Sequence, residues 1–220
     1  MTTTTLQPSH LPPTPPSEPS HDLAKMSSKA DSAHGTMPTS SQHKHIWVIT
    51  GPAGCGKTSV AEHLHRSHDL PYLEGDAFHT PENVKKMADG HPLTDADRWD
   101  WLILLREEAL KALATTDGVI VTCPALKRKY RDVMRIAAYH HPEVRVHFVF
   151  LKATEALLMD RVRARQGHYM KDYMVRSQFE SLEAPTVEEP DVLSVDASGT
   201  SEEVKELALA TVGKVMEESA

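Results

Sequence analysis

Residues 51–58 read Gly-Pro-Ala-Gly-Cys-Gly-Lys-Thr, and this segment constrains the chain more than any other. It satisfies the pattern GxxxxGK[ST], directly after the apolar run 46–50 and before the amphipathic stretch 58–67. A strand, a glycine loop and a helix in this order are typical of a phosphate-binding loop, in which backbone N–H groups and a helix N-terminus surround a phosphate. A glycine-rich turn with an incidental lysine is the alternative, and it would not require this context. We therefore expect an α/β protein with a phosphate site at one edge of its sheet.

The loop pattern assigns a role to each of its positions. Lys57 is expected to reach the β- and γ-phosphates of a nucleotide, and the Thr58 hydroxyl to ligate Mg²⁺. The backbone around the phosphates is expected to come from Gly51, Ala53, Gly54, Cys55 and Gly56.

Strand-like and helix-like patterns alternate along the rest of the chain. Apolar runs at 46–50, 71–73, 119–122, 144–151 and 192–195 predict strands, and periodic stretches between them predict helices, among them one over 126–139. Thr154 is placed to cap a helix that runs through Arg165, and Thr200 with Glu203 forms a capping box for the last helix. The alternation predicts a three-layer α/β fold, with a parallel sheet of about five strands, helices on both faces and a lid.

Two acidic residues follow the second predicted strand. Glu74 and Asp76 are two positions apart, so on an extended segment they point the same way, at the edge where the phosphate loop lies. We expect Glu74 to face the Mg²⁺ shell and Asp76 to orient and deprotonate an acceptor hydroxyl. His79 lies on the same segment and is a candidate substrate contact. An Asx-type turn with a surface histidine is the alternative.

Basic residues in two places are candidates for binding anionic groups. Lys127, Arg128 and Arg131 follow the third predicted strand and are placed to hold an anionic part of the substrate. Arg161 and Arg165 are four positions apart in a predicted lid over about 161–176, where they would stabilise charge on a transferring phosphoryl group. Solvated helix faces are the alternative for both groups.

Composition excludes several classes of protein. The formal net charge of −7 repels polyanions, so a general nucleic-acid binder is excluded, and no apolar run approaches the roughly 18 residues of a membrane span. Residues 1–44 hold seven of the fifteen prolines and no aromatic residue, which is typical of a disordered tail. This tail lacks the features of a targeting signal, so we expect a folded domain over 45–220 in the cytoplasm.

The two cysteines cannot form a disulfide framework. Cys55 lies among backbone N–H groups at a helix N-terminus near Lys57, which favours a reactive thiolate that Mg-ATP would protect. A thiol packed beneath the loop is the alternative. Cys123 ends the third predicted strand, which in the usual order of such folds lies beside the first, so its sulfur is a candidate neighbour of Cys55.

With these residues in place, the chain from about 47 to 212 resembles the small bacterial and fungal gluconokinases of the P-loop kinase superfamily. Two blocks are especially similar: LTDADRWDWL at 93–102 and ALKRKYRD at 125–132. The others are the loop 51–58, residues 74–79 with 81–83, residues 86–87, and residues 165–168 followed by 177–185. The chain departs from the family at Glu74, where Asp is usual, and at Cys55, where Ser or Gly is commoner, and it has no Walker B aspartate after 119–122.

The resemblance implies phosphorylation of D-gluconate to 6-phospho-D-gluconate with ATP and Mg²⁺, by a cytosolic homodimer that feeds the pentose phosphate pathway. It also implies substrate contacts by Arg98 and Gln178. A related shikimate or adenylylsulfate kinase is an alternative, against which residues 99–101 (Trp-Asp-Trp) argue. A nucleotide-binding regulator without transfer activity is another, and the presence of Lys57, Thr58 and Asp76 argues against it.

Overall fold

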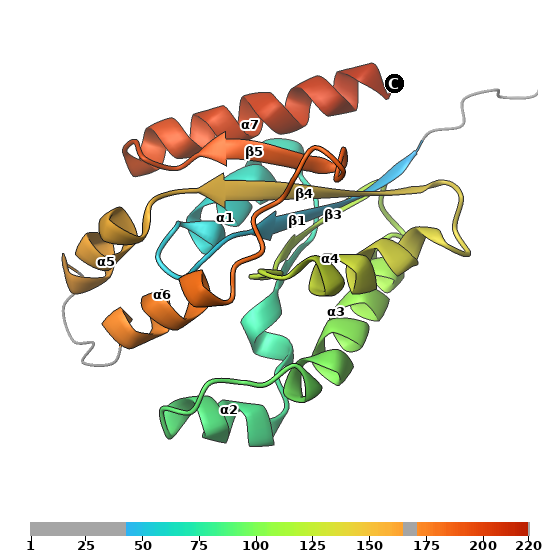
Figure 1. Ribbon diagram of the computed structural model, residues 1–220. Helices are drawn as coiled ribbons and strands as arrows, with labels where there is room; N and C mark the ends of the chain where they lie inside the picture. Colours follow the sequence, from blue (N-terminus) through green and yellow to red (C-terminus); the bar gives the residue numbers. More distant parts are fainter. Residues whose placement is uncertain (1–42, 165–170, 220) are drawn as a thin grey trace, which may run out of the picture. The chain divides into compact units, whose positions relative to one another are not determined.

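A computed structural model of the chain describes residues 43–164 and 171–219, and its centre is a parallel sheet (Figure 1). The strand order across the sheet is β2-β3-β1-β4-β5, with every neighbouring pair parallel. The strands are β1 (Lys44–Thr50), β2 (Tyr72–Glu74), β3 (Gly118–Thr122), β4 (Val144–Lys152) and β5 (Val192–Asp196). The predicted five-stranded parallel sheet is confirmed.

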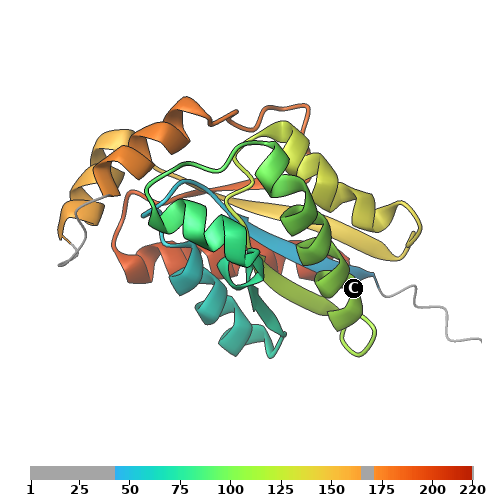
Figure 2. The ribbon, with the colours of Figure 1, turned by 90° about the horizontal axis from the view of Figure 1, so that it is seen from below.

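Helices connect the strands and cover both faces of the sheet (Figures 1 and 2). The α-helices are α1 (Lys57–His68), α2 (Pro81–Ala88), α3 (Trp99–Ala112), α4 (Arg128–Arg135), α5 (Glu155–Ala164), α6 (Lys171–Glu180) and α7 (Ser201–Glu218). Three short 3-10 helices are η1 (Gly75–Phe78), η2 (Ala96–Arg98) and η3 (Ile136–Ala138).

The core has two parts because β1 is central and buried on both sides. Trp47 and Ile49 point to the face covered by α1 and α7, whereas Ile46 and Val48 point to the face covered by α3 and α4. All four side chains have no exposed surface. A strand that is apolar at successive positions is expected in a parallel sheet with helices on both faces. The loop that lines the pocket follows directly after this buried strand.

The helix boundaries confirm some predictions and correct others. Thr154 Oγ1 accepts from Leu157 N at 3.3 Å, and the capping box of Thr200 and Glu203 is present at the start of α7. The single helix predicted over 126–139 is wrong in its extent, because α4 begins at Arg128 and continues as η3. The helix predicted through Arg165 is described to Ala164, and Arg165 lies outside the described residues.

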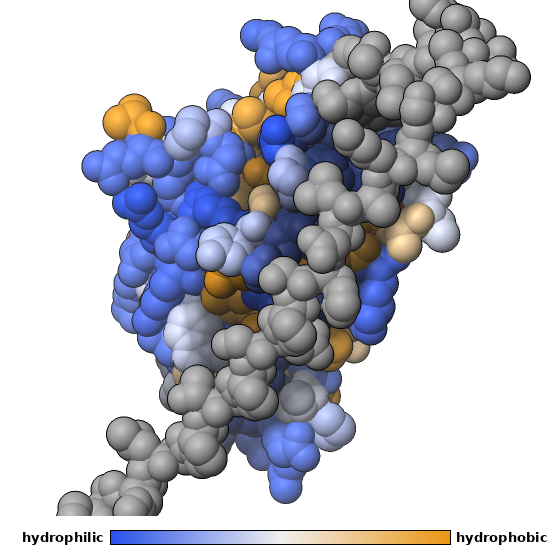
Figure 3. All heavy atoms as spheres, turned by 90° about the vertical axis from the view of Figure 1, so that its right-hand side faces the viewer, coloured by the Kyte–Doolittle hydropathy of each residue, from blue (hydrophilic) through white to orange (hydrophobic). Residues whose placement is uncertain are grey.

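None of the helices in the described parts of the chain combines the length and the apolar character needed to cross a membrane. The side of the domain where β4 begins faces the viewer in Figure 3, and outside the grey atoms its surface is mainly hydrophilic with smaller hydrophobic areas. The exposed Tyr139 lies just after η3, on the connection that leads into β4. The opposite edge of the sheet, where the strands end, carries the pocket.

Candidate active site

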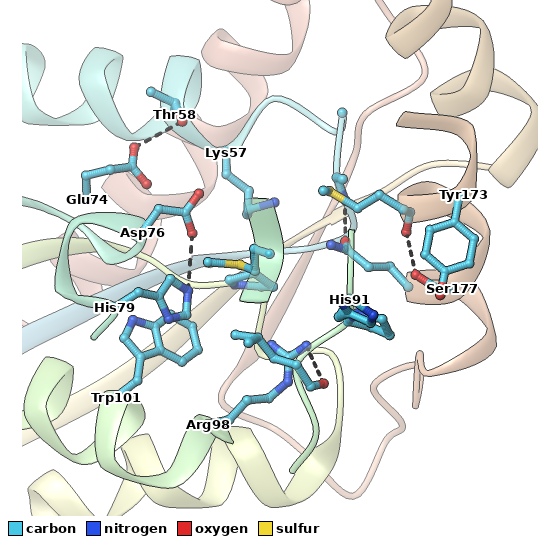
Figure 4. A pocket seen from close by; sticks show the side chains of 18 of the residues that line it. Lys57, Thr58, Glu74, Asp76, His79, His91, Arg98, Trp101, Tyr173 and Ser177 are labelled. Atoms are coloured by element: carbon cyan, nitrogen blue, oxygen red, sulfur yellow. Dashed lines mark hydrogen bonds and ion pairs between the residues drawn. The ribbon is translucent and has the colours of Figure 1, made fainter. Parts of the chain in front are cut away.

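A pocket of about 360 Å³ lies at the carboxyl ends of the strands (Figure 4). This volume is within the range of small-molecule sites, and this edge is where ligands bind in open α/β sheets. Five segments of the described chain line the pocket: the loop after β1 with the start of α1, the end of β2 with the segment after it, the stretch from the end of α2 into α3, Pro124 after β3, and one face of α6.

The loop between β1 and α1 has the conformation expected of a phosphate-binding loop. Gly51 and Gly56 have φ angles of 140° and 101°, values that residues with a side chain rarely adopt. Lys57 Nζ donates to Gly51 O at 3.0 Å and to Pro52 O at 3.2 Å, so the amine lies over the loop. The pocket is lined here by Ala53, Gly54, Gly56, Lys57 and Thr58. Gly51 does not line it, and a Cβ at this position would lie 2.9 Å from Leu151 O.

Cys55 points away from the pocket, so the prediction of a reactive thiolate is wrong. Its side chain is 2% exposed and packs in the core beneath the loop, and a Cβ on Gly51 would lie 2.9 Å from its Sγ. Burial raises the pKa of Cys55 more than the charge of Lys57 lowers it. Cys123 lies in the core on the other face of the sheet, where burial raises its pKa to about 12.

Thr58 and Glu74 form the oxygen-rich end of the pocket. Thr58 Oγ1 donates to Glu74 Oε2 at 3.1 Å, and the same carboxylate accepts from the hydroxyls of Tyr72 and Thr122. Burial and the adjacent Glu74 carboxylate raise the pKa of Tyr72, which keeps its hydroxyl a donor. Glu74 is thereby fixed beside the Thr58 hydroxyl.

This donor set fits Mg²⁺, which prefers oxygen ligands and is usually held by one or two protein groups together with phosphates and water. The described residues contain no cluster of three or more His, Cys, Asp or Glu side chains that could hold a metal alone. A metal at this end of the pocket would therefore depend on Thr58, Glu74 and a bound phosphate.

Asp76 reaches the pocket because the chain turns sharply after β2. A Cβ on Gly75 would lie 2.1 Å from Thr122 O, so only glycine fits against β3 at this position. Trp101 Nε1 donates to Gly75 O at 2.8 Å, and the Trp101 ring stacks on His79 with ring centres 4.3 Å apart. His79 Nε2 lies 3.9 Å from Asp76 Oδ1. Burial lowers the pKa of His79, which favours its neutral form beside the exposed Asp76 carboxylate.

Helix α6 closes the phosphate end of the pocket. Ala53 N donates to Gln178 Oε1 at 2.6 Å, which ties the helix to the loop, and Tyr173, Met174 and Ser177 also line the pocket. Arg161, predicted to act in the lid, instead donates to Ala197 O at 2.7 Å and to Gly199 O at 2.6 Å. The structure does not bring Arg161 into the pocket, and Arg165 lies outside the described residues.

The basic cluster of α4 also lies outside the pocket. Arg131 is 1% exposed and forms two hydrogen bonds to Glu189, at 2.6 and 2.7 Å. Arg128 pairs with Glu188 at 2.9 Å, and Lys127 pairs with Asp95 at 2.9 Å. The substrate role predicted for Lys127, Arg128 and Arg131 is not supported by these positions.

Arg98 and Gln178, which only the family resemblance indicated, both line the pocket. Sequence reasoning from single residues missed the apolar and histidine contacts contributed by the end of α2, by the stretch that follows it and by α6. These are Met87, His91, Pro92, Leu93, Tyr173 and Met174. The only signal for them in the sequence is their position within or beside the blocks shared with the resembled family.

The sequence of the chain is similar to those of known proteins. The model of the AAA domain matches residues 46–186. The chain is 40% identical to the probable gluconokinase of Schizosaccharomyces pombe, over 83% of this chain and 95% of that protein. It is 37% identical to the thermoresistant gluconokinase of Escherichia coli, over 73% of this chain and 89% of that protein.

A solved structure shows the same likeness. The crystal structure of a gluconokinase from Sinorhizobium meliloti superimposes with a TM-score of 0.70 at 39% identity, covering 79% of this chain and 94% of that one. The phosphate loop, the Asp76 segment and α6 all lie within residues 46–186, which the model of the AAA domain matches. The chain therefore belongs to the gluconokinase family.

Proposed function

We propose that this protein transfers the γ-phosphoryl group of ATP to the terminal hydroxyl of D-gluconate, giving 6-phospho-D-gluconate and ADP. One observation supports the proposal most: a single pocket holds Lys57 and Thr58 of the phosphate loop together with Asp76. The names of the relatives, which are gluconokinases, give the substrate class.

At the nucleotide end, the protein contributes binding and charge. The backbone of residues 51–58 and the start of α1 hold the phosphates, and Lys57 moves from its loop carbonyls to the β- and γ-phosphates. Mg²⁺, when bound beside Thr58 and Glu74, neutralises part of the phosphate charge. These groups stabilise the charge that develops on the transferring group, which is the main contribution an enzyme makes to this reaction.

At the acceptor end, Asp76 orients the terminal hydroxyl and accepts its proton. The hydroxyl oxygen forms a bond to the γ-phosphorus, and the bond from that phosphorus to the β,γ-bridging oxygen breaks. The electron pair of the broken bond stays on the bridging oxygen, which leaves as part of ADP. The reaction therefore needs no further reactant. His79 Nε2 lies 3.9 Å from Asp76 Oδ1, and burial lowers the pKa of His79, so the Asp76 carboxylate is next to a neutral imidazole rather than a charged one.

A cytoplasmic homodimer, implied by the resemblance, is part of this proposal. Sedimentation of the full chain and imaging of a tagged protein in cells test these two points separately.

The activity itself is tested by measuring ATP-dependent ADP release with gluconate, shikimate, adenylylsulfate and glycerate. Turnover with gluconate well above the other three supports the proposal. Preference for another acceptor would assign a related kinase activity, and a folded, ATP-binding protein inactive on all four would favour a regulatory role.

A further inference from the structure

We infer that Asp97 is a positioning residue of the acceptor site, because its carboxylate closes the base of the segment 87–93, which forms one wall of the pocket. This segment, which we call the wall segment, leads from the end of α2 toward η2. The inference rests on the proposed function, because it names the residue that holds this wall in place for the acceptor. The residues of the wall segment that line the pocket (Figure 4) are Met87, Gly90, His91, Pro92 and Leu93.

The first support is that one oxygen atom binds both ends of the wall segment. Asp97 Oδ2 accepts from Lys86 Nζ at 2.5 Å, and Lys86 directly precedes the segment. The same oxygen accepts from Thr94 N and from Thr94 Oγ1, both at 2.6 Å, and Thr94 directly follows the segment. The wall segment is therefore a closed loop with the Asp97 carboxylate at its base.

The second support is that α2 has few other contacts to hold it. Neither hydrophobic core cluster of the described chain contains a residue of α2, and Val84 on this helix is exposed. Within the described residues, the side-chain hydrogen bonds that run from α2 to another element both end on Asp97. Lys86 Nζ binds the carboxylate, and Asn83 Nδ2 donates to the main-chain oxygen at 2.7 Å. Removal of the carboxylate leaves the bond from Asn83 alone.

The third support is the backbone of the wall segment itself. Gly90 has a φ angle of 81°, which allows the chain to turn out of α2, and His91 N donates to Lys86 O at 3.0 Å. The part of the segment after His91 makes no backbone–backbone hydrogen bond to the described chain. Its position therefore depends on the bonds from Thr94 to Asp97.

Printed contacts also connect the wall segment to the acceptor end of the pocket. Leu93 O accepts from Arg98 Nη2 at 3.3 Å. Besides burial, the charge of Arg98 lowers the pKa of His79, and His79 Nε2 lies 3.9 Å from Asp76 Oδ1. No hydrogen bond within the described ranges joins the wall segment to residues 51–58. The wall held by Asp97 therefore belongs with Asp76 rather than with the phosphate loop.

This arrangement prepares the pocket before the acceptor binds. A wall that is already in place lowers the cost of binding, because the segment does not have to be ordered at that moment. Release of the wall segment would weaken acceptor binding and leave Asp76 and the phosphate loop unchanged. The expected signature is a higher KM for gluconate at an unchanged kcat.

Steady-state kinetics of the full chain test the inference with Asp97→Ala, which removes the three bonds to the carboxylate. The KM for gluconate is expected to rise about 5- to 30-fold, the loss typical of one or two hydrogen bonds, while kcat and the KM for ATP stay within about twofold. Lys86→Met and Thr94→Val each remove one bond from the other side and should raise this KM by a smaller factor. Asp97→Glu keeps a carboxylate and should restore part of the affinity.

Asp100→Ala is the matched control, because Asp100 is exposed in the first turn of α3 and does not line the pocket. This variant should keep the wild-type KM. Hydrogen exchange gives a readout that does not depend on the acceptor. Peptides covering residues 86–94 should exchange about 5- to 30-fold faster in Asp97→Ala than in the wild type, and peptides covering residues 51–58 should not change. Melting temperatures establish that each variant is folded.

The inference is overturned if folded Asp97→Ala keeps the wild-type KM for gluconate, or if exchange over residues 86–94 does not change. It is also overturned if the KM for ATP rises as much as that for gluconate, since Asp97 would then serve the nucleotide. The proposed function fails separately, if the wild type forms no phosphate ester from gluconate. The exchange measurement then still decides whether Asp97 holds the wall segment.

Discussion

Glu74 and Asp76 are separated by one residue and face different partners, because Gly75 allows the chain to turn between them. Glu74 ends β2 and is held by the hydroxyls of Thr58, Tyr72 and Thr122. Asp76 is the second residue of η1, with its side chain 78% exposed in the pocket. The environment of each carboxylate, rather than its residue type, sets its proposed role at the metal or at the acceptor.

Lys57→Ala is expected to reduce kcat at least about 10²-fold while the fold is retained. The ammonium group at the phosphate end stabilises charge that grows during phosphoryl transfer, and alanine removes it without affecting the core. Steady-state kinetics measure kcat, and a thermal melt shows whether the fold is retained. Lys111→Ala, an exposed lysine paired with Glu108, is the matched control and should leave kcat unchanged. Near-normal turnover by folded Lys57→Ala would refute the assignment of the loop.

Asp76→Asn is expected to lower kcat about 10²- to 10⁴-fold with little change in the KM for ATP, because the amide cannot accept the proton of the acceptor. The control is Asp160→Asn, whose carboxylate is 76% exposed on α5 and outside the pocket. If Asp76→Asn instead weakened ATP binding and left kcat intact, Asp76 would belong to the metal site.

Residue types and spacing predicted the pocket-lining residues of the loop, the Glu74–Asp76 pair and His79, because strand ends in a parallel sheet meet at one edge. They did not predict the orientation of Cys55 or Arg131. Cys55 lies in the loop before α1 and belongs to the core beneath it, and Arg131 lies within α4, where it bonds to Glu189, 58 residues further along the chain. Contacts of this kind depend on the tertiary packing and do not show in residue spacing.

At the scale of elements, a buried ion pair fixes α4 to the segment that precedes β5. Arg131 and Glu189 are about 2% and 3% exposed in their side chains, and Arg135 also bonds to Glu189 at 2.7 Å. The two arginines lower the pKa of Glu189 to about 2. This network joins α4 to the segment before β5, which are separated by more than fifty residues of sequence.

Arg131→Met is expected to lower the free energy of unfolding by about 3–5 kcal/mol at pH 7, because it leaves a buried carboxylate without its main partner. Since the pKa of Glu189 is lowered by folding, its contribution is complete above its unfolded pKa of about 4.3 and is lost as the pH falls toward about 2. The difference in the free energy of unfolding between wild type and variant should therefore become smaller below pH 4. Urea unfolding of both proteins at pH 7 and pH 3.5 measures this difference.

The control for this experiment is Arg128→Gln, which breaks the exposed pair with Glu188 and should change stability little at either pH. A destabilisation by Arg131→Met no larger than that of the control would contradict a structural role for the buried pair.

Periodicity predicted the long elements better than the short ones. The central strands β1 and β3 are set by continuous apolar runs and α7 by a capping box, and these features are visible in the sequence. Helix α2 has eight residues and begins at Pro81, where Thr80 Oγ1 accepts from Asn83 N at 3.2 Å. A pattern this short does not distinguish a helix from a loop, and its place is fixed by Lys86 and Asn83 bonding to Asp97.

At the scale of the whole molecule, deletion of residues 1–40 is expected to leave kcat and the melting temperature essentially unchanged. This segment has no periodic apolar pattern with which to dock on the domain, and its three acidic and two basic residues leave it nearly neutral. Kinetics and differential scanning calorimetry of the truncated and full chains make the comparison. A large loss of either quantity would show that the segment contributes to the domain.

The central claim is that the pocket joins a phosphate loop to an acceptor site for the terminal hydroxyl of gluconate. Phosphorus NMR of the product formed from ATP, Mg²⁺ and D-gluconate tests it most directly. The expected result is one new phosphate ester, coupled to the protons of the terminal carbon and absent with Lys57→Ala. An ester at another hydroxyl, or ATP hydrolysis without any ester, would contradict the account.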